Sequence, residues 1–280
     1  MNRPLALLAV IAIVGCNSAG HKREGASAES EAVAVINRLG GDSRSNLRDG
    51  REVITYVNLF ERKCTDDDLE ALHVLRYLES LDLDSSQVTD RGVAHLQEMT
   101  RLERLNLSYT RVTDEGLRYL EGLTNLQNLG LNGTKITNAG VKHFQGLTRL
   151  ATLSLHETEV GDEGMATIGN LSGLRYLLLG KTRVGEAGLE RLQGLTSLQQ
   201  LHLDETQITD EGLRYLKGMN GLTWLNLNGD RITDQGLVHL RSHTQLVTLD
   251  LFSTRITLEG LRKLKRALPR TQVTSSLELP

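Results

Sequence analysis

The segment that decides the fold is Leu102-Glu103-Arg104-Leu105-Asn106-Leu107-Ser108-Tyr109-Thr110-Arg111-Val112-Thr113-Asp114-Glu115-Gly116-Leu117. Closely similar segments begin at Leu126, Leu198 and Leu222, so the pattern returns with a period of 24 residues. Self-similarity at a fixed period predicts structural units that stack and share a continuous core. We number these repeats 1 to 9 by their first residues, which are Ile54, Leu78, Leu102, Leu126, Leu150, Leu174, Leu198, Leu222 and Leu246.

Each repeat combines two hydrophobic periods. Leu105 and Leu107 alternate with polar residues, which predicts a short strand whose leucines face inward. Leu117, Leu120 and Leu123 follow at a spacing of three, which predicts a short helix that packs on the opposite wall. A single repeat therefore supplies one strand and one helix.

The start of the helical segment carries a recurring polar set. Thr113 and its equivalents are predicted to be N-caps, with Asp114 in the first turn, where negative charge complements the helix dipole. Gly116 recurs at the same place in repeats 2 to 9, although glycine costs about 1 kcal/mol relative to alanine in a helix. The repeated glycine predicts close packing between neighbouring repeats, whereas repeat 1, at the edge, has Asp68 there.

These residues resemble the leucine-rich-repeat family, in its 24-residue form related to the cysteine-containing repeats of F-box substrate adaptors. The resemblance covers residues 54–268. It implies an α/β solenoid of about nine repeats, a horseshoe with a parallel β-sheet on its concave face and short helices on its convex face. Where the family carries Asn or Cys, this chain has a hydroxyl column expected to form a hydrogen-bonded ladder that satisfies turning backbone groups, comprising Ser86, Thr110, Thr134, Thr158, Thr182, Thr206, Asp230 and Thr254.

Both ends of the array are predicted to be capped, because a solenoid must cover its outermost repeats. Residues 31–53 form the expected N-terminal cap, a helix followed by a hairpin that turns at Asp49-Gly50. Residues 269–280 form the expected C-terminal strand and tail, beginning where Pro269 ends the last helix.

The first residues are typical of an export signal. Leu5 to Val14 is apolar but about half of the ~20 residues that a spanning helix needs. Ile13-Val14-Gly15-Cys16 resembles the lipobox of bacterial lipoproteins, which implies a signal peptide at 1–15, lipid attachment at Cys16 and a flexible tether at 16–30. Asn17 is not Asp, so the resemblance implies outer-membrane rather than inner-membrane residence. The alternative is an ordinary cleaved signal with an incidental cysteine.

Composition and motifs argue against several classes of function. A net charge of −3 offers no basic face for nucleic acid, and two cysteines cannot build a disulfide scaffold. We find no phosphate loop, nucleophile elbow or His-Glu-x-x-His motif, and we expect no catalytic site, cofactor or metal. Cys64 replaces an inward Val or Ile and is expected to be an inert core residue.

The third, fifth and seventh residues of each repeat are expected to face outward from the strands. The residue types at these positions give the best indication of function. Aromatic residues gather there, and Tyr56 and Phe60 are expected to lie under the N-terminal hairpin. An exposed aromatic anchor with polar neighbours is typical of protein recognition. We therefore predict a patch on the strand face of repeats 5 to 9, made of His156, Tyr176, Leu178, His202, Trp224 and Phe252.

We interpret the sequence as a monomeric, non-enzymatic protein-binding module anchored to the bacterial cell envelope. One alternative is the substrate-adaptor role of the F-box relatives, although no segment resembles an F-box. Another is an envelope enzyme or metal site around His156, His202 and Asp204. A third is a structural spacer without a specific ligand.

Overall fold

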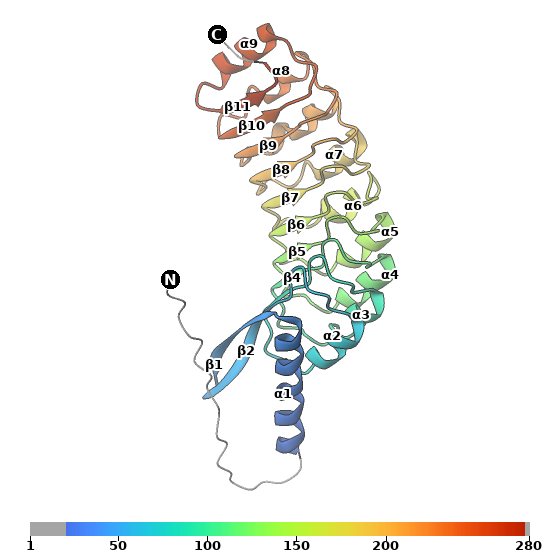
Figure 1. The fold of residues 1–280 in the computed structure, drawn as a ribbon. Coiled ribbons are helices and arrows are strands. Elements are labelled where there is room, and N and C mark those ends of the chain that lie inside the picture. The colour runs from blue at the N-terminus through green and yellow to red at the C-terminus, as the bar shows by residue number, and fades with distance from the viewer. Residues whose placement is uncertain (1–20, 278–280) are drawn as a thin grey trace.

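The computed structural model describes residues 21–277 as one long, gently curved solenoid (Figure 1). Its single sheet has eleven strands in chain order, antiparallel between β1 and β2 and parallel from β2 onward. The strands are β1 (Asp42–Arg48), β2 (Arg51–Asn58), β3 (Ser80–Asp82), β4 (Arg104–Asn106), β5 (Asn128–Gly130), β6 (Thr152–Ser154), β7 (Tyr176–Leu178), β8 (Gln200–His202), β9 (Trp224–Asn226), β10 (Thr248–Leu251) and β11 (Gln272–Ser275).

Short helices cover the side of the solenoid opposite the strands (Figure 1). Their shortness follows from the 24-residue period, which leaves room for a single strand and one or two helical turns. The α-helices are α1 (His21–Leu39), α2 (Asp66–Leu72), α3 (Asp90–Ala94), α4 (Asp114–Leu117), α5 (Asn138–Val141), α6 (Met165–Ile168), α7 (Glu186–Leu192), α8 (Leu237–Leu240) and α9 (Leu258–Ala267), with 3₁₀ turns η1 (Arg118–Leu120), η2 (Lys142–Phe144) and η3 (Gly212–Gly218).

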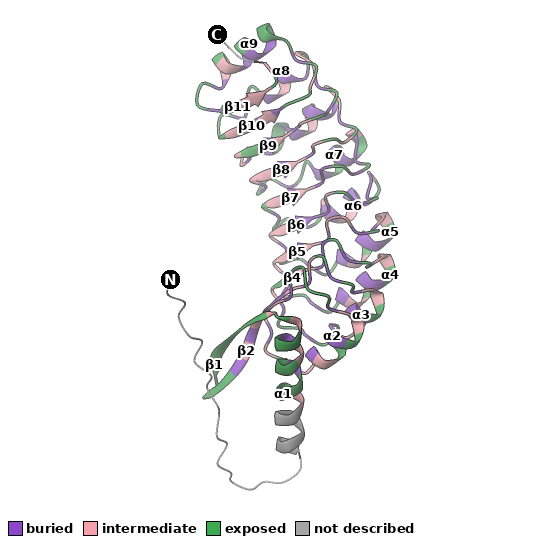
Figure 2. Ribbon diagram, in the orientation of Figure 1, coloured by how far each residue is buried: buried purple, intermediate pink, exposed green. Residues whose placement is uncertain are grey.

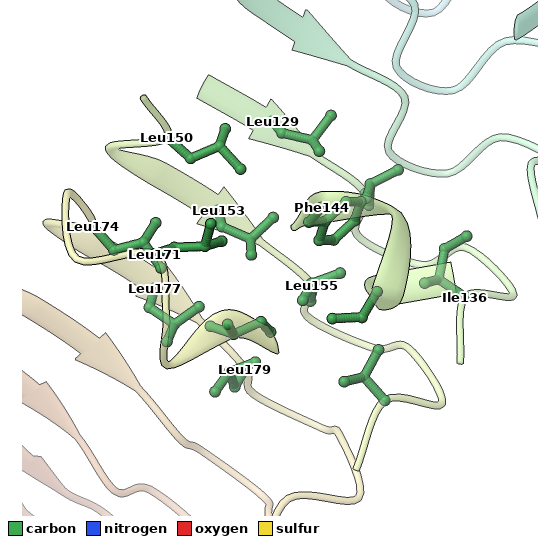
Figure 3. Packing of buried hydrophobic residues seen from close by; sticks show 14 of the residues in the cluster. Leu129, Ile136, Phe144, Leu150, Leu153, Leu155, Leu171, Leu174, Leu177 and Leu179 are labelled. Atoms are coloured by element: carbon green, nitrogen blue, oxygen red, sulfur yellow. The ribbon is translucent and has the colours of Figure 1, made fainter. Parts of the chain in front are cut away.

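The core is a stack of leucine columns between the strands and the helices (Figures 2 and 3). Leu105, Leu129, Leu153, Leu177 and Leu201 are paired in register from one strand to the next, and each is at most 2% exposed. Burial of a leucine contributes about 1.5–3 kcal/mol, so neighbouring repeats stabilise one another. The predicted solenoid with nine strand-bearing repeats is confirmed.

The hydroxyl column stabilises turns within each repeat rather than linking one repeat to the next. Thr110 Oγ1 donates to the Leu107 carbonyl at 2.6 Å, and Thr134, Thr158, Thr182 and Thr254 repeat this geometry. The predicted role in satisfying turning backbone is therefore confirmed for these five threonines, but the expected ladder is wrong, because each bond lies within one repeat. Three members of the column differ, namely Ser86, Thr206 and Asp230.

Asp230 causes the difference at Thr206. The Thr206 amide and hydroxyl donate to Asp230 Oδ1 at 2.9 and 3.1 Å, while the buried Asp230 Oδ2 has no partner among the described residues. Burial raises the pKa of Asp230 to about 7, with Asp204 and Glu205 adding to the rise. Likewise, Ser86 Oγ is buried without a partner in the described part of the chain.

The acid column links each repeat to its successor. Asp90 Oδ1 accepts from the Thr113 amide and Oδ2 from its hydroxyl, both at 2.7 Å, and this two-pronged contact recurs along the array. A Cβ on Gly116 would overlap Asp90 Oδ1, which explains why glycine recurs despite its low helix propensity. The sequence predicts this close packing, but it predicts for the acid only an interaction with the helix dipole.

Repeat 1 has no preceding repeat and supplies the missing acid itself. Asp68, in the glycine column, accepts from the Thr65 amide and hydroxyl at 2.8 and 2.9 Å. Arg38 of the cap helix pairs with the same carboxylate, and these hydrogen bonds outweigh burial and lower the pKa of Asp68. An aspartate in place of the glycine thus completes the first turn.

The N-terminal cap is larger than predicted. Helix α1 starts at His21 and so includes part of the predicted 16–30 tether, whose Ala, Glu, Lys and Arg content favours a helix. The hairpin turns at Asp49-Gly50 as expected, but β2 runs on from the hairpin into repeat 1. The predicted signal peptide and the lipid-attachment residue Cys16 lie outside the described residues.

At the C-terminal end of the array, α9 ends before Pro269 and β11 pairs in parallel with β10. Within residues 21–277, no helix is both long and apolar enough to cross a membrane.

Candidate functional site

The outward strand positions form a ribbon on the side of the solenoid opposite the short helices (Figure 1). The parallel register stacks equivalent positions about 4.8 Å apart from repeat to repeat. Side chains at the third, fifth and seventh positions therefore form three columns along the ribbon. The two halves of this strand face differ in chemistry.

The N-terminal half contains a hollow of about 330 Å³, of mixed polar and apolar lining, that was not predicted from the sequence. Small residues open it, because Gly130, Ser108 and Ser154 stand where larger side chains would fill the space. The available signal was the glycine at the middle outward position of repeat 4. Tyr56 and three leucines contribute apolar surface, namely Leu81, Leu105 and Leu129. The remaining lining is polar and comprises Ser80, Asp82, Asp84, Arg104, Asn106, Asn128, Asn132 and Thr152.

Polar groups in the hollow are paired with one another. Asn106 Nδ2 donates to Asp84 Oδ2 at 3.3 Å, and Arg104 Nε donates to Ser80 Oγ at 3.3 Å. Burial raises the pKa of Asp82, and the charge of Asp84 adds to that rise. These contacts pair the polar groups of the hollow with one another, and its aromatic lining residue, Tyr56, is half-buried.

The N-terminal end of the ribbon is only partly covered by the hairpin. The Arg44 guanidinium lies 4.8 Å from the centroid of the Tyr56 ring, so that ring is half-buried as expected. Phe60 is 44% exposed, so the predicted covering of this side chain is wrong.

The C-terminal half carries the predicted patch, with Trp224 as its largest exposed side chain. The indole is 37% exposed, and its Nε1–H donates to Asp250 Oδ2 at 2.7 Å. The His202 ring lies against it, with centroids 4.9 Å apart and planes inclined by 51°. Burial lowers the pKa of His202, and the Asp204 and Asp250 charges only partly oppose this, so a neutral imidazole packs on the indole.

The remaining predicted residues surround this pair. Leu178 is the register partner of His202 on the preceding strand and is half-buried. Tyr176 shares a column with Trp224, and its hydroxyl donates to Gln199 Oε1 at 3.3 Å. Phe252, 46% exposed, lies in the seventh-position column, where the Asn228 Oδ1 holds its amide at 2.6 Å. The patch therefore spans the full width of the ribbon.

His156 meets Asp204 across an intervening glycine. His156 Nδ1 lies 3.9 Å from Asp204 Oδ2, and Asn226 Nδ2 donates to Asp204 Oδ1 at 2.9 Å. A Cβ on Gly180, in the repeat between them, would overlap both side chains. Sequence spacing separated His156 from Asp204 by two repeats, and only the side-chain conformations bring them together.

The chemistry available to an enzyme at this site is limited. Within residues 21–277, no group of three or more His, Cys, Asp or Glu residues could hold a metal ion. Cys64 is buried as predicted, and burial raises the pKa of its thiol to about 12, which keeps it protonated at neutral pH. His156 and Asp204 form a pair whose neighbours are an amide, a glycine and a second imidazole.

Comparison with known proteins agrees with this architecture. Segments 74–96, 99–120, 194–217 and 242–265 match the family model described as Leucine Rich repeat. No curated protein sequence matches the chain. An internalin C2 from Listeria monocytogenes superposes with a TM-score of 0.53 at 24% identity, covering 88% of this chain and 92% of the internalin. A second Listeria monocytogenes internalin, inlF, gives 0.50 at 18% identity over 89% and 95% of the two chains.

The fold and the strand ribbon define a repeat solenoid of the kind that presents one continuous face. Four segments of the chain match the Leucine Rich repeat model, so the chain carries leucine-rich repeats, and it shares the fold of the two internalins. At these identities the similarity to the internalins describes the fold alone.

Proposed function

We propose that this protein is a non-enzymatic binding module that engages a protein partner with the strand face of repeats 5 to 9. The observation that carries the proposal is Trp224, an exposed indole held in one orientation by Asp250 and His202. A fixed aromatic side chain loses little conformational entropy on binding, which is why tryptophan dominates many interfaces.

A capture experiment tests the proposal. Crosslinking in intact cells, followed by purification of wild type and of the Tyr176→Ala, Trp224→Ala double variant, should show loss of a specific partner from the variant. Phe60→Ala is the matched control, since Phe60 occupies the column of Phe252 with similar exposure, 44% against 46%, at the other end of the ribbon. An unchanged set of captured proteins would rule out the patch.

We further propose that the module is tethered to the bacterial cell envelope through lipid on Cys16, with outer-membrane residence. The support is the lipobox-like Ile13-Val14-Gly15-Cys16 and the absence of Asp at position 17. Several acyl chains on one residue hold a protein firmly, since each buried methylene contributes ~0.8 kcal/mol.

Cys16→Ser should move the protein from the detergent phase to the aqueous phase in a two-phase extraction. Cys64→Ser is the matched control, because Cys64 is a core residue of repeat 1. Retention of the Cys16→Ser protein in the detergent phase would contradict lipid attachment at this residue.

A further inference from the structure

The aromatic patch lies in an electronegative part of the strand face. The outward positions of repeats 5 to 9 contain two carboxylates, Asp204 and Asp250, and neither Lys nor Arg. His202 adds no positive charge at neutral pH, because burial lowers its pKa. The flanking columns of the same repeats, at the second and eighth positions, add bases and acids in equal number, namely Arg175, Lys181, Glu157 and Glu205.

Neutral donors hold both carboxylates in place. Asp250 accepts from Trp224 Nε1 at 2.7 Å and from Thr274 Oγ1 at 2.6 Å, and Asp204 accepts from Asn226 Nδ2 at 2.9 Å. In the described part of the chain neither carboxylate forms an ion pair with Lys or Arg. Hydrogen bonds orient these charges without cancelling them, so both remain available to a cation from outside.

The Asp250 charge lies directly beside the Trp224 ring. The Asp250 carboxylate touches the edge of the Trp224 indole, while 37% of the Trp224 residue remains open to solvent. Tryptophan is the strongest cation–π acceptor among the side chains, and a guanidinium can stack on its face while donating to a carboxylate at its edge. Asp204 is shielded as well, with 18% of its side chain exposed, which weakens the screening of its charge by salt.

We propose that the partner presents a basic segment, and that an Arg or Lys side chain of this segment stacks on Trp224 and pairs with Asp250, with Asp204 as a second contact. This inference rests on the proposed function, since it specifies the partner for the same patch. Charge complementarity selects a basic polypeptide as the occupant.

Intrinsic fluorescence tests the inference without knowledge of the partner, because Trp224 is the only tryptophan in the chain. The probe is a blocked tetra-arginine peptide, compared with blocked tetra-glutamine and tetra-glutamate. We expect a saturable change in tryptophan emission with tetra-arginine alone, and a weaker affinity at higher salt. An equal response to tetra-glutamine would overturn the inference.

Charge-removing variants test the two carboxylates. Asp204→Asn and Asp250→Asn keep the acceptor oxygens for Asn226 and Trp224, so the patch retains its hydrogen bonds. Each should weaken tetra-arginine binding about 3- to 5-fold, the range expected of a partly exposed charge pair. Asp82→Asn is the matched control. It removes the same charge at a distance of about 29 Å from Trp224, six repeats away at the usual strand spacing, which is well beyond the Debye length. It should change the affinity less than 2-fold.

The two proposals fail in different ways. If partner capture requires Trp224 but persists unchanged in the Asp204→Asn, Asp250→Asn double variant, the binding face stands and the basic partner is wrong. If capture is lost from both variants, the inference is supported. If capture is independent of Trp224, the proposed function fails, and the inference for this patch fails with it.

Discussion

Two surfaces of the same repeats, the turn flank and the strand face, differ in how strictly their residue types recur. On the turn flank, where strand leads to helix, the Asp–Thr–Gly set recurs almost unchanged because each Asp binds the Thr of the next repeat and each Gly makes room for that Asp. On the strand face, the outward columns hold Trp224, Gly130, Arg104 and other unrelated side chains. Contact between repeats restricts the residue types on the flank, whereas no such recurring contact restricts the outward columns of the strand face.

The largest effect is expected on the turn flank, from Gly140→Ala. Helix propensity alone predicts a gain of about 1 kcal/mol, but the new Cβ would overlap Asp114 Oδ1 and crowd Leu117. We expect the free energy of unfolding to fall by about 2–4 kcal/mol in chemical denaturation. Gly194→Ala is the control, because no atom lies within 4 Å of a Cβ there, and it should be neutral or stabilising.

A double-mutant cycle can identify the cause. Asp114→Ala removes both hydrogen bonds to Thr137 and also the atom that a Cβ at position 140 would meet. The combined variant should therefore be less destabilised than the sum of the single variants, by about 1–2 kcal/mol. Simple additivity would show that glycine recurs for a reason other than the carboxylate.

A smaller effect is expected from Asp230→Thr, which restores the hydroxyl column. The fold raises the pKa of Asp230 to about 7, from 3.8 for an ordinary Asp, so the folded state binds more protons than the unfolded state between these values. The stabilisation by the neutral carboxyl is complete below pH 3.8 and is lost as the pH rises through about 7. Asp230→Thr should therefore add about 1–3 kcal/mol at pH 8 and less at pH 5.

Asp230→Asn separates charge from shape at this position. It should also flatten the dependence of stability on pH, since the amide does not titrate. Thermal unfolding of the three proteins from pH 5 to pH 8 would measure both effects, and an equal slope in wild type and variants would contradict the raised pKa.

A smaller gain in stability is expected from a substitution in the core. His243 occupies a column that carries Leu or Met in the other central repeats, and its Nδ1 is buried without a partner in the described residues. His243 Nε2 lies 2.9 Å from the Leu216 carbonyl, which also accepts the Met219 amide at 2.8 Å. His243→Leu should raise the free energy of unfolding by about 1 kcal/mol. His239→Leu, on the solvated helix side, should change it by less than about 0.5 kcal/mol.

The smallest effects on stability are expected on the strand face. Phe252→Ala and Phe60→Ala should each lower the free energy of unfolding by less than about 1 kcal/mol, because nearly half of each residue is exposed. Only Phe252→Ala should reduce partner capture. A large loss of stability from either would indicate that the strand face serves the fold, and the contrast between the two surfaces would disappear.

Much of this molecule could be predicted from its sequence. The 24-residue period gave the number of repeats, the inward leucines and the Thr N-caps of repeats 1 to 4 and 9, because these depend on the alternation and spacing of residues within one repeat. In repeats 7 and 8 the helical segment begins later, and Glu211 and Gly236 are the N-caps instead of Thr209 and Thr233. The candidate patch was also predictable in outline, since a regular register assigns outward positions to defined columns.

Contacts between repeats were decided by the tertiary structure alone. Asp90 binds Thr113, and His156 contacts Asp204 over Gly180, only when the repeats are stacked and the side-chain rotamers are fixed. Asp68 likewise replaces the aspartate that a preceding repeat would supply to Thr65. The hollow around Gly130 likewise arises from side chains of five repeats. The period specifies whether a side chain points inward or outward. The atoms that the side chain contacts belong to other repeats, which are distant in sequence, so these contacts depend on how the repeats stack.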